Sequence, residues 1–168
     1  MPKMGTLSVS EFEDIKAIQA KIDEVLLDMA SKELGVSVDE LVVRDLIPSD
    51  IGFSNEDWTV SASTANTYND FTSTTVADNR FIAIYGVAGV DTDIVSAVRF
   101  TSGAKTLDIW SLQEIRALQN KFKAAKRPII LRQNTAIDID IYATSTGSVT
   151  MPLLGRVCEL KGRVVEPG

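Results

Sequence analysis

The sequence predicts a mainly β protein: an antiparallel β-sandwich with an N-terminal amphipathic helix and one further helix inserted between strands. Three observations predict this fold class. Isoleucines alternate with polar residues from Ile137 to Ile141, which is the period of a strand with one buried face. Apolar residues recur every three or four positions in the first part of the chain, as in an amphipathic helix. Residues 128–165 contain short apolar runs separated by Gly, Pro and Ser, a pattern typical of strands joined by turns.

The first element is a helix that should begin near Ser10 and end at Gly35. Ser10-Glu11-Phe12-Glu13 has the pattern of a capping box, and glycine commonly ends a helix. The apolar stripe can pack on the chain's own sandwich, or it can pair with the same helix of neighbouring subunits. Both arrangements remain open. The residues predicted for a contact with a partner or another subunit are Phe12, Ile15, Ile22, Leu26 and Met29 of this helix, together with Trp58.

A short helix and a polar segment should follow. Ser37-Val38-Asp39-Glu40 is a second capping box, which predicts a short helix or turn through Leu41 and Val42 that Pro48 ends. Residues 1–50 are therefore interpreted as a helical arm and residues 51–168 as the sandwich domain. Between residues 51 and 79 only Thr59–Ala62 is expected to form a strand, because Thr64–Thr75 shows no sustained periodicity and should cross the surface as a loop.

The middle of the chain predicts a strand meander followed by the inserted helix. Residues 80–87 are apolar on both faces, so this strand should be central in its sheet. Strands at 94–100 and 106–110 should follow it. Ser111-Leu112-Gln113-Glu114 is a third capping box and predicts a helix that Pro128 ends. The helix would carry Leu112, Ile115, Leu118 and Phe122 on one face, with Lys121, Lys123, Lys126 and Arg127 at its end as candidates for an anion contact.

The last third should form the strands that close the sandwich. Ile137, Ile139 and Ile141 are predicted to point into the core, with Asp138 and Asp140 facing water. A turn at Thr146–Ser148 predicts a hairpin with the next strand. Pro152 cannot donate a backbone hydrogen bond, so it should lie at a sheet edge or a bulge.

Composition excludes several functional classes. The chain has 168 residues, a formal charge of -6 and a pI near 4.7, which argues against nucleic-acid binding because phosphate recognition needs clustered Lys and Arg. The sequence has no histidine and one cysteine, so it offers no Ser-His-Asp or Cys-His pair and no internal disulfide. No apolar run approaches the roughly 20 residues needed to cross a bilayer, and no secretory signal pattern is present. We therefore expect no enzymatic activity, no cofactor, no metal and no membrane partner.

The remaining chemical candidates have simpler structural interpretations. Cys158 lies within an alternating strand pattern and should be a small buried apolar residue. Asp91 and Asp93 flank a threonine in a glycine-rich turn, but the further acids of a calcium loop do not follow at the required spacing. Asp138 and Asp140 could form a carboxylate pair, although a solvated strand face explains them as well.

The order of elements resembles the single jelly-roll subunits of viral capsids and the β-sandwich head-decoration, or cement, proteins of bacteriophages. The resemblance is strongest in residues 127–141 and 151–162, and it covers about the C-terminal half. It implies a non-enzymatic structural protein of the virion, made in the host cytoplasm and located on the head surface. Such a protein would form a homo-oligomer, most simply a trimer, and bind the major capsid protein. The alternative is a carbohydrate- or ligand-binding module that uses Trp58 or Tyr68 in the polar segment 54–78 as a stacking surface.

Overall fold

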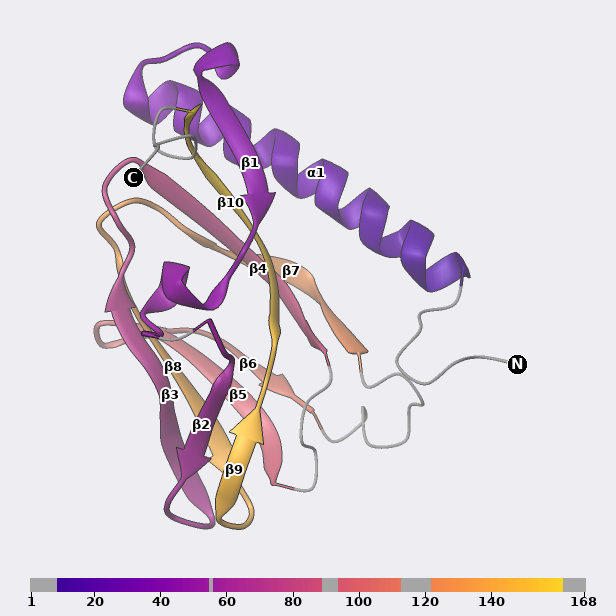
Figure 1. Cartoon of the computed structure of the whole chain (residues 1–168), viewed down its shortest axis with the longest axis vertical. Helices are drawn as coiled ribbons and strands as arrows, with labels where there is room; N and C mark the ends of the chain where they lie inside the picture. Colours follow the sequence, from indigo (N-terminus) through magenta and orange to yellow (C-terminus); the bar gives the residue numbers. More distant parts are fainter. Residues whose placement is uncertain (1–8, 55, 89–93, 113–121, 162–168) are drawn as a thin grey trace.

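The computed structural model describes residues 9–54, 56–88, 94–112 and 122–161 of the chain (Figure 1). Strands dominate the part of the chain that is described. The elements are α1 (Val9–Leu34), η1 (Val38–Glu40), β1 (Leu41–Asp45), η2 (Pro48–Ile51), β2 (Thr59–Ala62), β3 (Thr67–Thr75), β4 (Arg80–Ala88), β5 (Val95–Ser102), β6 (Lys105–Ser111), β7 (Phe122–Leu131), β8 (Ala136–Ala143), β9 (Gly147–Thr150) and β10 (Leu153–Leu160).

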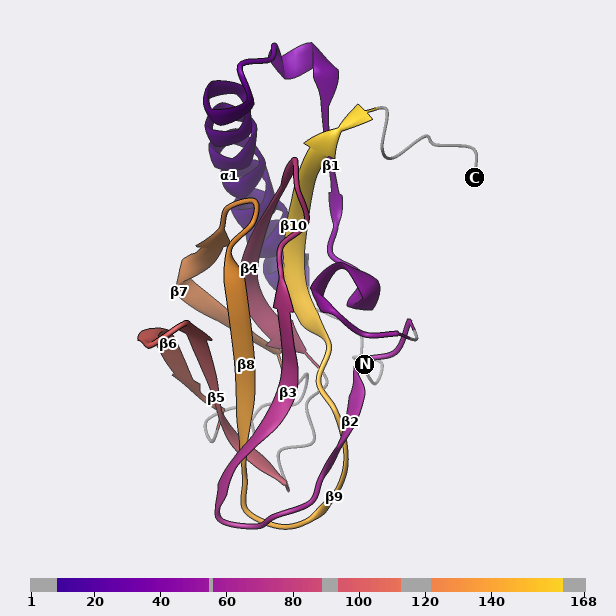
Figure 2. The same cartoon turned by 90° about the vertical axis from the view of Figure 1, so that its left-hand side faces the viewer.

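The strands form an antiparallel sandwich of the jelly-roll-like kind. One four-stranded sheet has the order β1-β10-β4-β7, and the other has the order β3-β8-β5-β6. A two-stranded sheet, β2-β9, extends the end opposite α1 (Figures 1 and 2). The predicted fold class, mainly β with an N-terminal helix, is confirmed.

The main core lies between the two large sheets. Ile137, Ile139 and Ile141 of β8 are buried there, while Asp138 and Asp140 face outwards and are partly exposed. The central position predicted for residues 80–87 is also correct, because β4 lies between β10 and β7. Both faces of β4 are buried, one against the other large sheet and one beneath α1.

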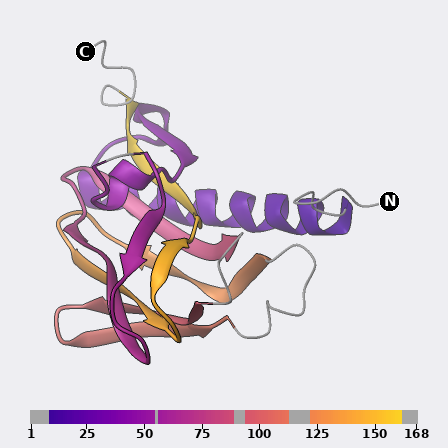
Figure 3. The same ribbon diagram turned by 60° about the horizontal axis from the view of Figure 1, so that its bottom comes forward.

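A second core joins α1 to the outer face of the β1-β10-β4-β7 sheet. Ile22, Leu26 and Ala30 of the helix pack with Phe81 and Ala83 of β4 and with other residues of this sheet. Figure 3 shows α1 lying across this sheet, on the side away from β5 and β6. Of the two arrangements left open by the sequence, the structure shows the helix packed on its own sandwich. Gly35 follows the helix with a φ of 68°, a left-handed conformation that favours glycine.

Four charged side chains connect the sheet that carries α1 to the segment after β1. Arg44 donates to both Asp50 and Glu159 at 2.8 Å, and Arg80 contacts the same two carboxylates at 3.3 and 3.1 Å. The hydrogen bonds to Asp50 raise the pKa of Arg44 further above its usual value. Each acid therefore has two cationic partners, which offsets the cost of burying Asp50 and Glu159.

Two predictions in the polar and first helical regions are wrong. The short helix or turn expected to continue through Val42 stops at Glu40, because Leu41–Asp45 form β1 and pair with β10. The loop expected at Thr64–Thr75 is largely strand β3, which pairs with β8 along its length. Backbone pairing at a sheet edge explains β3, although the strand has almost no apolar alternation.

The prediction of an inserted helix is wrong for the residues that the structure describes. Residues 122–131 form β7, which pairs with β4, and Ser111 belongs to β6; residues 113–121 lie outside the described residues. Pro128 does not end a helix but lies within β7, beside an irregular register between Ile84↔Ile129 and Gly86↔Ala124. β7 is an edge strand, where a missing N–H is tolerated.

Pro152 lies between β9 and β10, where the chain passes from the two-stranded sheet to the larger one. The proline is therefore at a strand break, and its carbonyl accepts a hydrogen bond from the backbone N–H of Ala88. Gly155 marks a register shift in β10. A Cβ atom there would lie 2.6 Å from the carbonyl oxygen of Ala83, so this close approach requires glycine.

Candidate interaction surface

The most distinctive surface feature is an apolar groove between α1 and the edge strand β7. It has a volume of about 580 Å³, and we call it the α1–β7 groove. Its lining residues are Ala17, Ile18, Lys21, Ile22, Val25, Tyr85, Arg127, Pro128 and Ile130.

The groove exists because α1 covers the sheet without a further strand beside β7. The buried face of the helix leaves the neighbouring positions Ile18 and Val25 at the margin, and Val25 is 41% exposed. Ile130 points towards the helix side of β7, whereas Ile129 and Leu131 belong to the core between the sheets. Apolar side chains from two elements thus border one open space, which is the usual composition of a binding surface.

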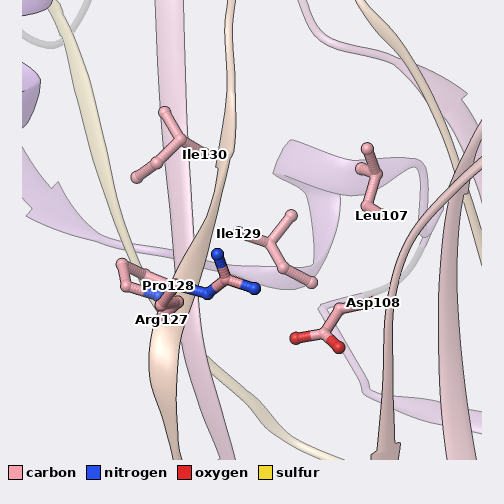
Figure 4. A pocket seen from close by; sticks show the side chains of 6 residues that line it. All are labelled: Leu107, Asp108, Arg127, Pro128, Ile129 and Ile130. Carbon is pink, nitrogen blue, oxygen red and sulfur yellow. The ribbon is translucent and has the colours of Figure 1, made fainter.

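Two basic residues border this apolar groove, Lys21 of α1 and Arg127 of β7. The guanidinium of Arg127 points to the other side of β7, where Asp108 lies (Figure 4). Neither basic residue belongs to an ion pair within the part of the chain that the structure describes. Lys21 is therefore the basic residue of this groove that could pair with an acidic group of a partner.

A second groove of about 540 Å³ continues along the C-terminal half of α1 and shares Val25 with the first. Its polar lining is internally paired. Arg132 and Gln133 both donate to Glu33, at 2.9 and 3.0 Å, and Lys32 is 3.1 Å from Asp28. Exposed pairs of this kind contribute little to the free energy of folding. Because these charges are already paired within the chain, they are less available to a partner than Lys21 of the α1–β7 groove.

A third hollow of about 310 Å³ lies where the open edges of the two sheets meet, between β6 and β7. In Figure 4 the guanidinium of Arg127 points to the side where Asp108 lies. The Asp108 carboxylate already accepts hydrogen bonds from the Ile109 backbone at 2.8 Å and the Trp110 indole at 3.0 Å. Asp108 therefore has a structural role in holding β6.

The predicted partner-contact residues are distributed between core and margin. Ile22 and Leu26 are buried in the second core, and Ile15 and Met29 are half-buried against it. The side chain of Phe12 lies outside the described residues. Of this predicted set, Ile22 lines the exposed groove, together with residues that were not predicted for a contact, notably Val25 and Ile130.

Trp58 is a core anchor. Its ring meets Phe53 edge to face, with ring centroids 5.7 Å apart, and it packs against the main core. Tyr68 is covered in part by the Arg99 guanidinium, whose carbon is 3.9 Å from the ring centroid, and it contacts Tyr142 edge to face. Both aromatic side chains are engaged with the chain's own residues.

Three carboxylates gather on the outer face of the β3-β8-β5-β6 sheet. Oxygen atoms of Asp70, Asp138 and Asp140 lie within 4.8 Å of one another, a donor set that divalent cations can use. Arg99 donates to Asp140 at 2.9 Å, and the Ser73 hydroxyl lies 2.6 Å from Asp138. Burial, with the neighbouring Asp138 and Asp140 charges, raises the pKa of Asp70. Asp70 was not part of the predicted pair because β3 was expected to be a loop.

The thiol lacks the properties of a nucleophile. Cys158 is buried in the second core, as predicted. Burial raises the pKa of this thiol to about 11, so the reactive thiolate is scarce at neutral pH. Asp91, Asp93 and Lys121, and the side chains of Lys123 and Lys126, lie outside the described residues.

Among the described residues, no helix is both long and apolar enough to span a membrane. Comparison with protein families finds no match, and no curated protein matches the sequence. Among solved structures, the chain is similar to the subviral particle of infectious bursal disease virus VP2, with 12% identity and a TM-score of 0.36 over 74% of this chain and 34% of that chain. It is also similar to the T13 particle of the same virus, with 12% identity and a TM-score of 0.33 over 74% of this chain and 32% of that chain. The chain thus spans about a third of the length of these viral chains, and similarity this low assigns no family.

Proposed function

We propose that this chain is a non-enzymatic structural protein of a virus particle, which assembles with copies of itself and binds the major capsid protein. The observation that carries the proposal is the exposed α1–β7 groove, an apolar surface between α1 and the edge strand β7. Surfaces of this kind mark protein contacts. The virus class comes from the resemblance of the strand and helix order to capsid and head-decoration proteins.

The other candidate chemistry favours contact over catalysis. The chain has no histidine, and its buried thiol has a raised pKa. Asp140 is paired with Arg99, and Asp138 accepts a hydrogen bond from Ser73. A binding role needs none of these groups to react, which is why we place the function in the surface beside α1.

Within this proposal, the chain decorates the outside of a bacteriophage head as a trimer. A trimer would let three copies of the groove act together, so that weak individual contacts sum to stable attachment. The chain would be made in the host cytoplasm and retained in the finished virion. Its net charge of -6 is consistent with a protein that contacts other proteins and does not bind the packaged nucleic acid.

The test is to purify particles from the source of this sequence on a density gradient and to quantify the chain by mass spectrometry. The proposal predicts that the chain co-migrates with the major capsid protein at a fixed ratio. It also predicts that mild treatment strips the chain while the shell stays intact. Absence of the chain from intact particles would contradict the proposal.

A further inference from the structure

The proposed function leaves open which surfaces join one copy of the chain to the next. Resting on that proposed function, we propose that the turn η1 of one copy binds in the hollow between β6 and β7 of the next copy. Val38 of η1 would cover the apolar lining of this β6–β7 hollow, and Asp39 would pair with Arg127. The contact would join two different surfaces of the chain.

The β6–β7 hollow combines apolar side chains with an available cation. Its volume is about 310 Å³, and its lining includes Leu107 and Ile129. Arg127 lines it from the edge of β7, with its guanidinium on the side where Asp108 lies (Figure 4), and has no acidic partner among the described residues. Asp108 already accepts two N–H donors of its own strand. A partner for this hollow should therefore present an aliphatic side chain beside an acid.

The turn η1 presents that combination on the same chain. Val38 is 48% exposed. Asp39 is also exposed and has no hydrogen bond or ion pair within the part of the chain that is described. The Glu40 backbone N–H donates to the Ser37 carbonyl at 3.0 Å, and the Ser37 N–H donates to the Glu40 carboxylate at 3.1 Å. Because the turn is already ordered, it loses little conformational freedom on binding.

The other exposed apolar side chains do not fit the hollow as well. Among the described residues, the large apolar side chains with substantial exposure are Val25, Val38, Ile47 and Ile109. Val25 lines the α1–β7 groove itself. Ile47 is close in sequence to Asp50, which Arg44 already binds, and Ile109 follows the bonded Asp108 on β6. Val38 is therefore the one of these four that projects outside both recesses beside an unpaired acid.

The chain closes the opposite side of its own sandwich with a similar turn. There η2 contacts the edge strands β1 and β3, because Arg44 of β1 donates to Asp50 at 2.8 Å and the Thr72 hydroxyl of β3 donates to the Ile51 carbonyl at 2.6 Å. Ile51 is 0% exposed in the main core. In the described part of the chain, no such turn lies between β6 and β7. An acid beside an aliphatic residue of another copy would supply the equivalent contact.

The strand order shows that a chain cannot place its own η1 in its own hollow. The turn leads directly into β1, and β1 and β7 are the opposite edges of one sheet, with β10 and β4 between them. Three strand spacings amount to about 14 Å. All five residues of β1 pair with β10, which fixes η1 at its own edge. In Figures 1 and 2, η1 projects at the end of the molecule away from β2 and β9, where it is accessible to another copy.

This contact is compatible with the other surface proposed for assembly. The β6–β7 hollow and the α1–β7 groove share Arg127, Pro128 and Ile130, so one neighbouring copy would cover both. A contact between two different surfaces repeats from copy to copy and closes a ring when the rotation between copies permits it. Three copies would form the proposed trimer in this way.

The experiment mixes two full-length variants, each with one side of the contact removed. Val38→Asp removes the apolar side chain of η1, and Arg127→Glu reverses the charge of the hollow. Both sites are exposed, so folding should be preserved, which circular dichroism checks. In sedimentation velocity, each variant alone should assemble about tenfold more weakly than the native chain, or less. The mixture should form a one-to-one complex of about 37 kDa, twice the 18.3 kDa of one chain, because one intact turn and one intact hollow remain.

Matched controls separate this contact from general charge and hydrophobicity. Ile47→Asp makes a similar change at another exposed apolar residue, and Lys105→Glu makes the charge change at an exposed position of the β5–β6 hairpin. Both should assemble like the native chain. Asp39→Arg combined with Arg127→Glu in one chain should restore the ion pair and with it assembly.

Unchanged assembly of Val38→Asp or of Arg127→Glu, or no complex in the mixture, would overturn the inference. These measurements use only the purified chain. Absence of the chain from virions would therefore overturn the proposed function, and it would leave the measured contact between copies in place.

Discussion

At the scale of single residues, the two faces of β8 determine which substitutions the fold tolerates. Ile139 is 0% exposed in the main core, and the adjacent Asp138 faces solvent beside Ser73. This alternation was predicted from the sequence because a strand with one buried face has a period of two. The polar partners of the outward face were not predictable in the same way, because Asp70 and Ser73 come from β3, which lacks apolar alternation.

Replacing Ile139 with aspartate should unfold the protein, because the new carboxylate would be buried without a partner. We expect a loss of more than about 4 kcal/mol in the free energy of unfolding. Asp138→Ala should cost less than about 1 kcal/mol, since it removes one exposed hydrogen bond. Urea denaturation followed by tryptophan fluorescence measures both. Equal losses would mean that the assigned facing of β8 is incorrect.

Asp70 makes a prediction about pH. Its pKa is raised in the folded protein, first by burial and then by the neighbouring acids. A carboxyl group with a raised pKa opposes folding when it is charged, and this cost disappears as the pH falls through its titration range. Asp70→Asn should therefore raise the melting temperature at pH 7, and the difference from the native protein should shrink in acid. A lower melting temperature at pH 7 would contradict this account.

At the scale of elements, α1 is an integral layer of the fold. Leu26 is fully buried beneath the helix, whereas Val25, one residue earlier, is exposed at the α1–β7 groove. The sequence correctly predicted the helix, its Gly35 end and its apolar stripe. It could not indicate which margin of the stripe stays exposed, because that depends on where β7 ends the sheet.

Leu26→Asp and Val25→Asp test this assignment with the same change at adjacent positions. Leu26→Asp should cost more than about 4 kcal/mol, because it buries a charge in the second core. Val25→Asp should change the free energy of unfolding by less than about 0.5 kcal/mol, as is usual for an exposed site. Circular dichroism during urea unfolding at low protein concentration gives both values. A mild effect of Leu26→Asp would show that the helix does not depend on this core.

The region after β6 shows why sequence patterns can mislead at this scale. The capping box at Ser111 and the spacing of Leu112, Ile115, Leu118 and Phe122 favoured a helix. From Phe122 onwards the chain is β7 instead, because it pairs with one side of β4. Local propensity loses to long-range backbone pairing there. The four-residue charge network of Arg44, Asp50, Arg80 and Glu159 was also unpredictable, since its members meet only after the strands pair.

At the scale of the whole molecule, the chain is a β-sandwich with an exposed apolar groove beside α1. The main core and the second core stabilise the protomer, so the groove is available for a partner without unfolding any element. We propose that the apolar surface beside α1 is buried when copies of this chain assemble.

The most direct test is the mass of the purified chain in solution, measured by multi-angle light scattering at micromolar concentration. We predict a stable oligomer, and a trimer would have three times the 18.3 kDa of one chain, about 55 kDa. The mass should fall towards 18.3 kDa when Val25→Asp places a charge in the α1–β7 groove. A native chain that remains at the monomer mass across this concentration range would contradict the account.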